Sequence, residues 1–163
     1  QRIKVPWARI HDEASARTFA ADLMNAPPID CGGANAIGDA IDFSAHLIGT
    51  NDFSATRRII DVSGDGPDNR GGPVGLARDR AVLSGITING LAIINSGRTF
   101  GGPGGISLDE HYRRDVTGGQ GSFVLVVRQD ESTFAAAILN KLVLEISDKN
   151  LRSTHKRFAN SSR

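Results

Sequence analysis

Residues Arg57 to Asn69 read RRIIDVSGDGPDN and carry the strongest signal for the fold. It begins with apolar β-branched residues, which favour a strand, and an unbroken apolar run is typical of a strand covered on both faces. Gly64 to Pro67 then predicts a turn that ends this strand. Ligands of open α/β sheets bind just beyond the carboxyl ends of the strands. The oxygen-bearing side chains at the turn therefore indicate a candidate site for a hard cation such as Mg²⁺ or Ca²⁺.

A second interpretation of the turn is purely structural, with Asp65 and Asp68 shaping it through hydrogen bonds to nearby backbone amides. Asp61 also has two interpretations. A carboxylate inside a sheet needs a partner, and Arg57, Arg58 or a loop amide would provide one. Alternatively, Asp61 accepts hydrogen bonds from the waters of a bound ion.

Strands and helices alternate on both sides of this stretch. Further strands are predicted at residues 2–7, 86–94 and 122–128, and helices at 14–25, from 35 onward, at 73–83, at 107–116 and at 131–146. Strands separated by helices form parallel sheets through right-handed crossovers. The predicted fold class is therefore α/β: a doubly wound, mostly parallel sheet with helices on both faces. We expect the strand of the opening stretch at or near the centre of the sheet.

The helix ends and inward faces are predicted from capping residues and apolar spacing. Asp12, with Ser15 as the alternative, caps the first helix, Asn35 caps the second, and Ser107 forms a capping box with Glu110. The inward positions follow as lists: Ile37, Ile41, Ala45 and Ile48 in the second helix, Val74, Ala77, Ala81 and Leu83 in the third, and Phe134, Ala137 or Ile138, Leu142 and Ile146 in the last.

Length and composition bound the organisation of the chain. Its 163 residues suit one domain, predicted at 1–148, followed by a basic tail at 149–163. A net charge of +1 with mixed signs argues against a nucleic-acid partner, and the single cysteine, Cys31, excludes an intrachain disulfide. No stretch is long and apolar enough to cross a bilayer. About four strands is few for such a sheet, so we expect a first strand upstream of Gln1.

Several motifs then agree with one known fold. Val5-Pro6-Trp7, AIGDAID at 36–42, the stretch from Asp61 to Asn69 and GITINGL at 85–91 carry the likeness, together with HYRR at 111–114 and residues 118–124. The chain resembles the von Willebrand factor A fold over residues 1 to about 147. It is most similar to an uncharacterised bacterial family of secreted or periplasmic proteins with that fold.

The resemblance implies a metal-ion-dependent adhesion site, in which a divalent cation sits among three loops. In that fold the first strand contributes Asp-x-Ser-x-Ser, a later loop contributes a threonine, and a further strand contributes an aspartate. Asp65, followed by Gly66, matches the aspartate. The threonine position falls in residues 32–36, where Asn35 is the nearest replacement. The implied site is incomplete, with Asp65 and Asn35 as weak ligands of Mg²⁺ or Ca²⁺, and Ser63, Gly66 and Asn69 completing the binding edge.

The function implied by the resemblance is a non-enzymatic, adhesion-type protein-binding module, secreted or periplasmic. Its partner would be a protein, with self-association through the edge left by the missing strand as a further expectation. One alternative is a magnesium-dependent hydrolase that uses Asp61 and Asp65, but the sequence places no lysine or histidine beside them to act as an acid. The other alternative is a structural remnant without an active site.

Overall fold

The computed structural model describes residues 1–28, 33–94, 104–128 and 131–146. The chain divides into two compact units, residues 1–34 and residues 35–163. The predicted tail at 149–163 and Cys31 lie outside the described residues. In the described part of the chain, no helix has the length and apolar character needed to span a bilayer.

The first unit contains one helix, α1 (Glu13–Asn25). Its start is a capping box: the Asp12 carboxylate accepts from the Ser15 backbone N–H at 2.8 Å, and the Ser15 hydroxyl accepts from the Asp12 N–H at 3.1 Å. The predicted cap is therefore confirmed. The predicted strand at residues 2–7 is wrong. A strand needs a second strand for its backbone groups, and the described residues of this unit contain none.

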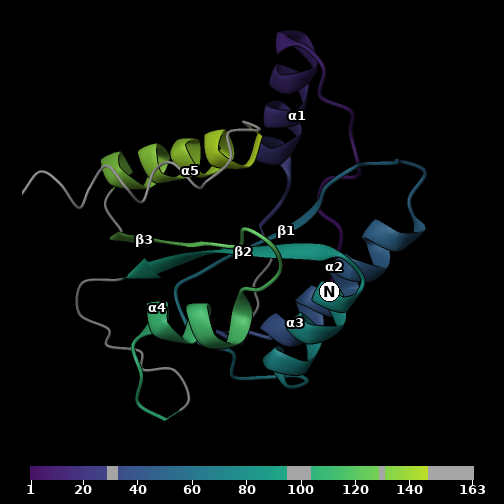
Figure 1. Ribbon diagram of the computed structural model, residues 1–163. Coiled ribbons are helices and arrows are strands. Elements are labelled where there is room, and N and C mark those ends of the chain that lie inside the picture. The colour runs from purple at the N-terminus through teal and green to yellow at the C-terminus, as the bar shows by residue number, and fades with distance from the viewer. Residues whose placement is uncertain (29–32, 95–103, 129–130, 147–163) are drawn as a thin grey trace, which may run out of the picture. The chain divides into compact units, whose positions relative to one another are not determined.

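The second unit holds a three-stranded parallel sheet in the order β1 (Arg58–Gly64), β2 (Ile86–Ile94) and β3 (Val124–Arg128). Figure 1 shows α2 (Ile37–Thr50), α3 (Val74–Leu83) and α4 (Leu108–His111) on one face, and α5 (Glu131–Ile146) on the other. The α/β fold with a parallel sheet and helices on both faces is thus confirmed. Gly85, at φ +75°, makes the turn from α3 into β2.

Among the described strands the central one is β2, and β1, which we expected at or near the centre, lies beside it at the edge. The difference follows from side-chain pattern. After Ile59 and Ile60, exposed Asp61 and Ser63 alternate with partly buried Val62 and Gly64, a pattern that a strand at an edge can have. Strand β2 is buried from Ile88 to Ala92 and is therefore the strand covered on both faces.

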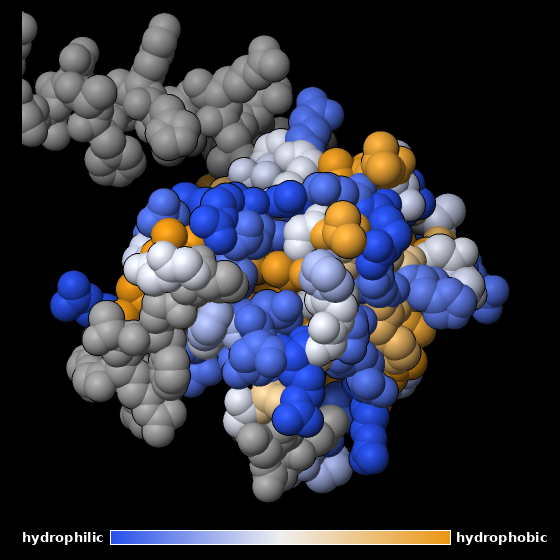
Figure 2. All heavy atoms as spheres, turned by 90° about the horizontal axis from the view of Figure 1, so that it is seen from below, coloured by the Kyte–Doolittle hydropathy of each residue, from blue (hydrophilic) through white to orange (hydrophobic). Residues whose placement is uncertain are grey.

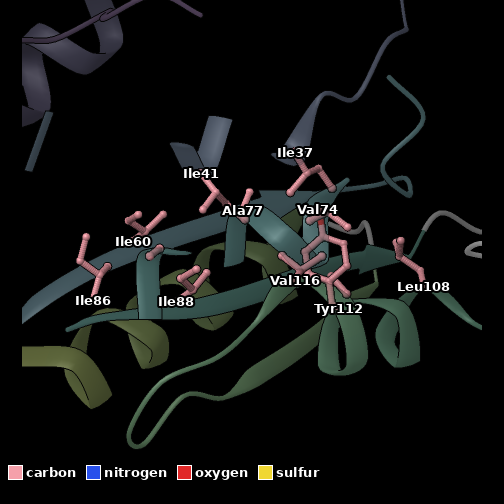
Figure 3. Packing of buried hydrophobic residues seen from close by; sticks show 12 residues of the cluster. Ile37, Ile41, Ile60, Val74, Ala77, Ile86, Ile88, Leu108, Tyr112 and Val116 are labelled. Atoms are coloured by element: carbon pink, nitrogen blue, oxygen red, sulfur yellow. The ribbon is translucent and has the colours of Figure 1, made fainter. Parts of the chain in front are cut away.

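One hydrophobic core lies between the sheet and the helices α2, α3 and η1, a π-helical turn at Tyr112–Val116 that continues α4. Ile60 of β1 is in register with Ile88 of β2, and both point into this core (Figure 3). Each fully buried side chain of this size stabilises the fold by about 1.5–3 kcal/mol. The predicted inward residues of α2 and α3 are confirmed, apart from Leu83, which is 87% exposed at the last position of α3.

Two predicted helix features are wrong. Ser107 occupies the N-cap position of α4, but its side chain makes no capping hydrogen bond; it bonds instead to Asp109, which lowers the pKa of that carboxyl group. In α5, Phe134 and Leu142 are 37% and 46% exposed, whereas Lys141 is only 3% exposed. The reason is the facing sheet, which presents the polar side chains of Asp61 and Asn89.

The outer surface agrees with the mixed charge of the sequence. Figure 2 views the chain from the side of α3 and α4, and hydrophilic residues cover most of the described surface there, with apolar residues scattered among them. Scattered apolar residues are normal on a protein surface and carry no functional signal of their own.

Candidate functional site

The loop that follows β1, residues 64–69, is joined to the start of α2 by two backbone-directed hydrogen bonds. The side-chain oxygen of Asn69 accepts from the Asn35 N–H at 2.8 Å, and the Asn69 N–H donates to the Asn35 carbonyl at 2.9 Å. We call this loop, with Asn35, the edge loop. The structure therefore brings together two residues of the predicted binding edge that lie 34 positions apart in sequence.

Gly66 is the point where the Asn35 side chain meets the loop. A Cβ built on Gly66 would lie 2.6 Å from Nδ2 of Asn35, so the amide of Asn35 rests against a bare glycine backbone. Gly66 is buried, while its neighbour Asp65 is exposed. Asn35, Asp65, Gly66 and Asn69 thus form one cluster at the carboxyl end of β1, where the sequence predicted a site.

Asp68 caps α2, which the sequence assigned to Asn35. Its Oδ1 accepts from the Ile37 N–H at 2.7 Å and from the Gly38 N–H at 3.5 Å. The Asn35 side chain makes no cap because its backbone is held by Asn69 and its amide lies over Gly66. A carboxylate satisfies the unpaired amides of the first turn and suits the positive end of the helix dipole. The place for an anion at this helix start is therefore taken by the protein itself.

His111 holds the edge loop from the α4 side, and sequence analysis did not identify it. Its Nε2 accepts from the Asp68 N–H at 3.3 Å, and its Nδ1 lies 2.8 Å from Oδ2 of Asp115. Since Nε2 accepts, the ring proton sits on Nδ1 and is donated to Asp115. Arg114, and then His111, hold the pKa of Asp115 below its ordinary value. His111 is fully buried, so this arrangement anchors the loop.

Tyr112 lies directly under the end of β1. A Cβ on Gly64 would be 2.6 Å from the Tyr112 hydroxyl, and the ring is fully buried (Figure 3). The hydroxyl makes no hydrogen bond to any described residue. Burial, reinforced by the negative charge of Asp65, raises the pKa of Tyr112 to about 12. Tyr112 also opens the π-helical turn η1, a rare element that often occurs at functional sites.

Asp61 belongs to a different cluster, on the α5 face of the sheet. It forms an ion pair with Lys141, whose ammonium also lies 2.8 Å from Oε1 of Glu145. Asn89, the register partner of Asp61, donates to the same Glu145 oxygen at 3.1 Å. We call these four residues the α5 clasp. Burial and the neighbouring Asp61 carboxylate raise the pKa of Glu145, against the opposing effect of Lys141.

None of the three partners proposed for Asp61 from the sequence is the one observed. The guanidinium groups of Arg57 and Arg58 donate instead to the backbone carbonyls of Glu145 and Ser84. A sequence signal for the true partner does exist, because Lys141 and Glu145 are the polar pair at i and i+4 within the apolar helix 134–146. Deciding that this pair faces the sheet required the structure.

The structure separates Asp61 from Asp65. Four residues along a strand span about 13 Å, and Asp61 is engaged by Lys141 on the α5 face. Ser63, one alternation further along the same face, is exposed. Asp61 is therefore engaged on the α5 face, and the edge loop retains only Asp65 of this pair.

The donor set at the edge loop can be compared with what a divalent cation requires. Within the described ranges, no group of three or more His, Cys, Asp or Glu side chains is placed to hold a metal. Asp68 is bonded to α2, so the ligands predicted from the sequence at this loop are the Asp65 carboxylate and the Asn35 amide oxygen. Mg²⁺ keeps several of its waters and is often bound through one or two carboxylates. The described residues of the edge loop do not provide a cage of protein oxygens for an ion.

Comparison with known proteins assigns the chain to one family. It belongs to the family described as "Protein of unknown function (DUF1194)", whose model matches residues 1–150. Neither the curated proteins nor the solved structures contain a significant match to the chain.

Proposed function

We propose that this chain is a non-enzymatic, adhesion-type binding module of the von Willebrand factor A kind, whose edge loop docks a protein ligand. The observation that carries the proposal is the construction of this loop. Asn69, Asp68 and His111 fix its backbone, while Asp65 stays exposed at the carboxyl end of β1. A loop that is already fixed in one conformation before binding loses little conformational entropy when it binds.

Asp65 and Asn35 are the residues that would hold a divalent cation at this loop, with Ser63 contributing through water. A bound Mg²⁺ or Ca²⁺ would supply a positive charge for an acidic group of the partner. One carboxylate and one neutral amide are few ligands, so the expected affinity is on the order of millimolar or weaker, as in the weakest calcium modules.

The hydrolase alternative has less support, because Asp61 pairs with Lys141 on the α5 face, whereas Asp65 lies beyond the end of β1. The proposal also includes an extracytoplasmic location, secreted or periplasmic. Strand β1 pairs only with β2 among the described strands, so its second edge is a candidate surface for self-association.

Calorimetric titration of the chain with MgCl₂ and CaCl₂ tests the edge loop. We expect weak binding to wild type, its loss in Asp65→Ala, and no change in Asp52→Ala, a matched control at an exposed aspartate after α2. Micromolar affinity that is lost in Asp65→Ala would overturn the claim that the site is incomplete. Metal binding that is unchanged in Asp65→Ala would show that the edge loop is not the cation site. That result would favour the structural remnant.

Turnover of a generic phosphoester in the presence of Mg²⁺ separates the binding module from the hydrolase. We expect no turnover above the buffer rate, for wild type or for Asp61→Asn. A rate that falls in both Asp61→Asn and Asp65→Asn would reverse the assignment.

A further inference from the structure

The α5 clasp brings an amine and two carboxyl groups into mutual contact. Lys141 pairs with Asp61 of β1, and its Nζ lies 2.8 Å from Oε1 of Glu145. Glu145 is in turn hydrogen-bonded to Asp61. Lys141 and Glu145 expose only 4% and 8% of their side chains, so bulk water screens this contact little. A lysine amine is a nucleophile toward carbonyl carbon, and Asp61 presents such a carbon to it.

The fold holds both sides of this contact in place. Asp61 lies in strand β1, in register with Asn89 of β2. Oδ1 of Asn89 accepts from the Phe123 N–H at 3.3 Å, and its Nδ2 donates to Oε1 of Glu145 at 3.1 Å. On the helix side, Arg57 donates to the Glu145 backbone carbonyl at 2.8 Å. Groups that a fold holds in contact react as if at very high concentration, because the entropy of bringing them together is already lost.

The position also favours a neutral product over an ion pair. Removing two charges from water carries a large desolvation cost. An amide between Lys141 and Asp61 has no net charge and avoids this cost. The Asp61 side chain is 36% exposed, so a water released at its carboxyl group has a path to solvent.

We propose that the α5 clasp is an intramolecular cross-linking site, where Nζ of Lys141 and Cγ of Asp61 join in an amide bond with Glu145 as the catalytic residue. A proton moves from the Lys141 ammonium to the Asp61 carboxylate, and the neutral amine attacks Cγ. Glu145 takes a proton from the attacking nitrogen and delivers one to the departing hydroxyl. The Nζ–Cγ bond forms, a Cγ–Oδ bond breaks, and one water leaves. The step needs no oxidant, reductant or further reactant.

Glu145 suits this role because its pKa is raised, first by burial and then by its hydrogen bond to Asp61. A carboxyl group with a raised pKa is a better proton carrier near neutral pH. The bond would tie the last described helix to strand β1, so that α5 could not separate from the sheet. The inference is independent of the cation site proposed at the edge loop.

Mass spectrometry of the purified, denatured chain tests the bond. We expect wild type and the control Asn140→Met to weigh less than their sequences by one water, and Lys141→Met and Asp61→Ala to have their full masses. Trypsin cleaves after a free lysine but not after an amide-linked one. The wild-type digest should therefore contain a branched peptide that joins residues 59–70 to residues 129–149. Glu145→Gln should slow bond formation by about 100-fold, so that unlinked chain remains in freshly purified protein.

The alternative outcomes are distinct. A wild-type chain with its full sequence mass, cleaved by trypsin after Lys141, would overturn the proposal. Loss of one ammonia, with a branched peptide that contains Asn89, would overturn the assignment to Asp61. A loss of water that persists in Lys141→Met would arise elsewhere in the chain and would overturn the cross-link. Because the branched peptide is sought in wild type, the test does not depend on the folding of any variant.

Discussion

The edge loop and the α5 clasp both begin on strand β1, but they use their carboxylates in opposite ways. In the edge loop, Asp68 bonds to backbone amides at the start of α2, and Asp65 is exposed. In the clasp, Asp61 and Glu145 share the buried ammonium of Lys141. In the edge loop, neutral backbone amides donate to a carboxylate. In the clasp, carboxylates form ion pairs with an ammonium group.

The difference shows that sequence proximity of carboxylates says little about shared chemistry. Asp61 lies within the strand, where its side chain points to one face of the sheet, and Asp65 lies beyond the strand end, where the chain is free to turn. The clasp fixes which side of α5 faces the sheet, so its role is structural. Under the proposed function, the edge loop is the region that would contact another molecule.

Removing the charge of Lys141 should have the largest effect. Lys141→Met leaves the Asp61 and Glu145 carboxylates facing each other, which should lower the free energy of unfolding by about 3–4 kcal/mol. Urea denaturation measures the loss, and Asn140→Met, at the exposed neighbouring position, is the control. A loss below about 1 kcal/mol would show that the clasp does not hold α5.

A comparable effect should appear in the edge region at alkaline pH. The pKa of Tyr112 is raised from 10.0 to about 12 in the folded protein. Between these values the unfolded chain ionises first, so the free energy of unfolding falls as pH rises, by about 2.7 kcal/mol. Stability measured at pH 10–12 should fall less in Tyr112→Phe by this amount. Absorbance near 295 nm, where tyrosinate absorbs, should report the pKa directly, and ionisation near pH 10 would contradict the burial.

Within the edge loop, Asp68 and Asp65 should differ in their effect on stability. Asp68→Ala removes the cap of α2 and should lower the free energy of unfolding by about 1–2 kcal/mol. Asp65→Ala, at an exposed position, should change it by less than about 0.5 kcal/mol. Hydrogen exchange of the Ile37 and Gly38 amides, which Asp68 caps, gives the local measurement. Equal changes in the free energy of unfolding in the two variants would show that Asp68 does not stabilise the loop more than Asp65 does.

The smallest expected effect is a change of pH slope in the clasp. The pKa of Glu145 is raised above 4.5 in the folded protein, first by burial and then by Asp61. Its contribution to stability is therefore complete below pH 4.5 and is lost as pH rises through the folded-state pKa. Denaturation from pH 4 to 7 should show a weaker decline in Glu145→Gln than in wild type. Identical profiles would mean that Lys141 neutralises Glu145 fully.

The elements of the fold were largely predictable. The strand at 86–94, the helix at 131–146 and the inward residues of α2 follow from periodicity alone and agree with the structure. Expected features failed where the pattern was weak or the partner was distant. The segment 2–7 alternates like a strand but pairs with no described strand. In α5, Phe134 and Leu142 of the expected apolar stripe are exposed, and Lys141 is buried instead. Alternation and stripes describe one segment, whereas burial depends on what faces it.

The location of the candidate site follows from local sequence. An apolar strand that ends in Gly-Asp-Gly places polar side chains at the carboxyl edge of a parallel sheet, because strand and turn propensities are local. Which residues lie together at that location depends on tertiary packing. Asn35 meets Gly66, Asp68 caps α2, and Tyr112 arrives from η1. Asp61 is drawn away to Lys141. These pairings join residues 30 to 80 positions apart, and such contacts are set by packing and charge compensation, which no local pattern encodes.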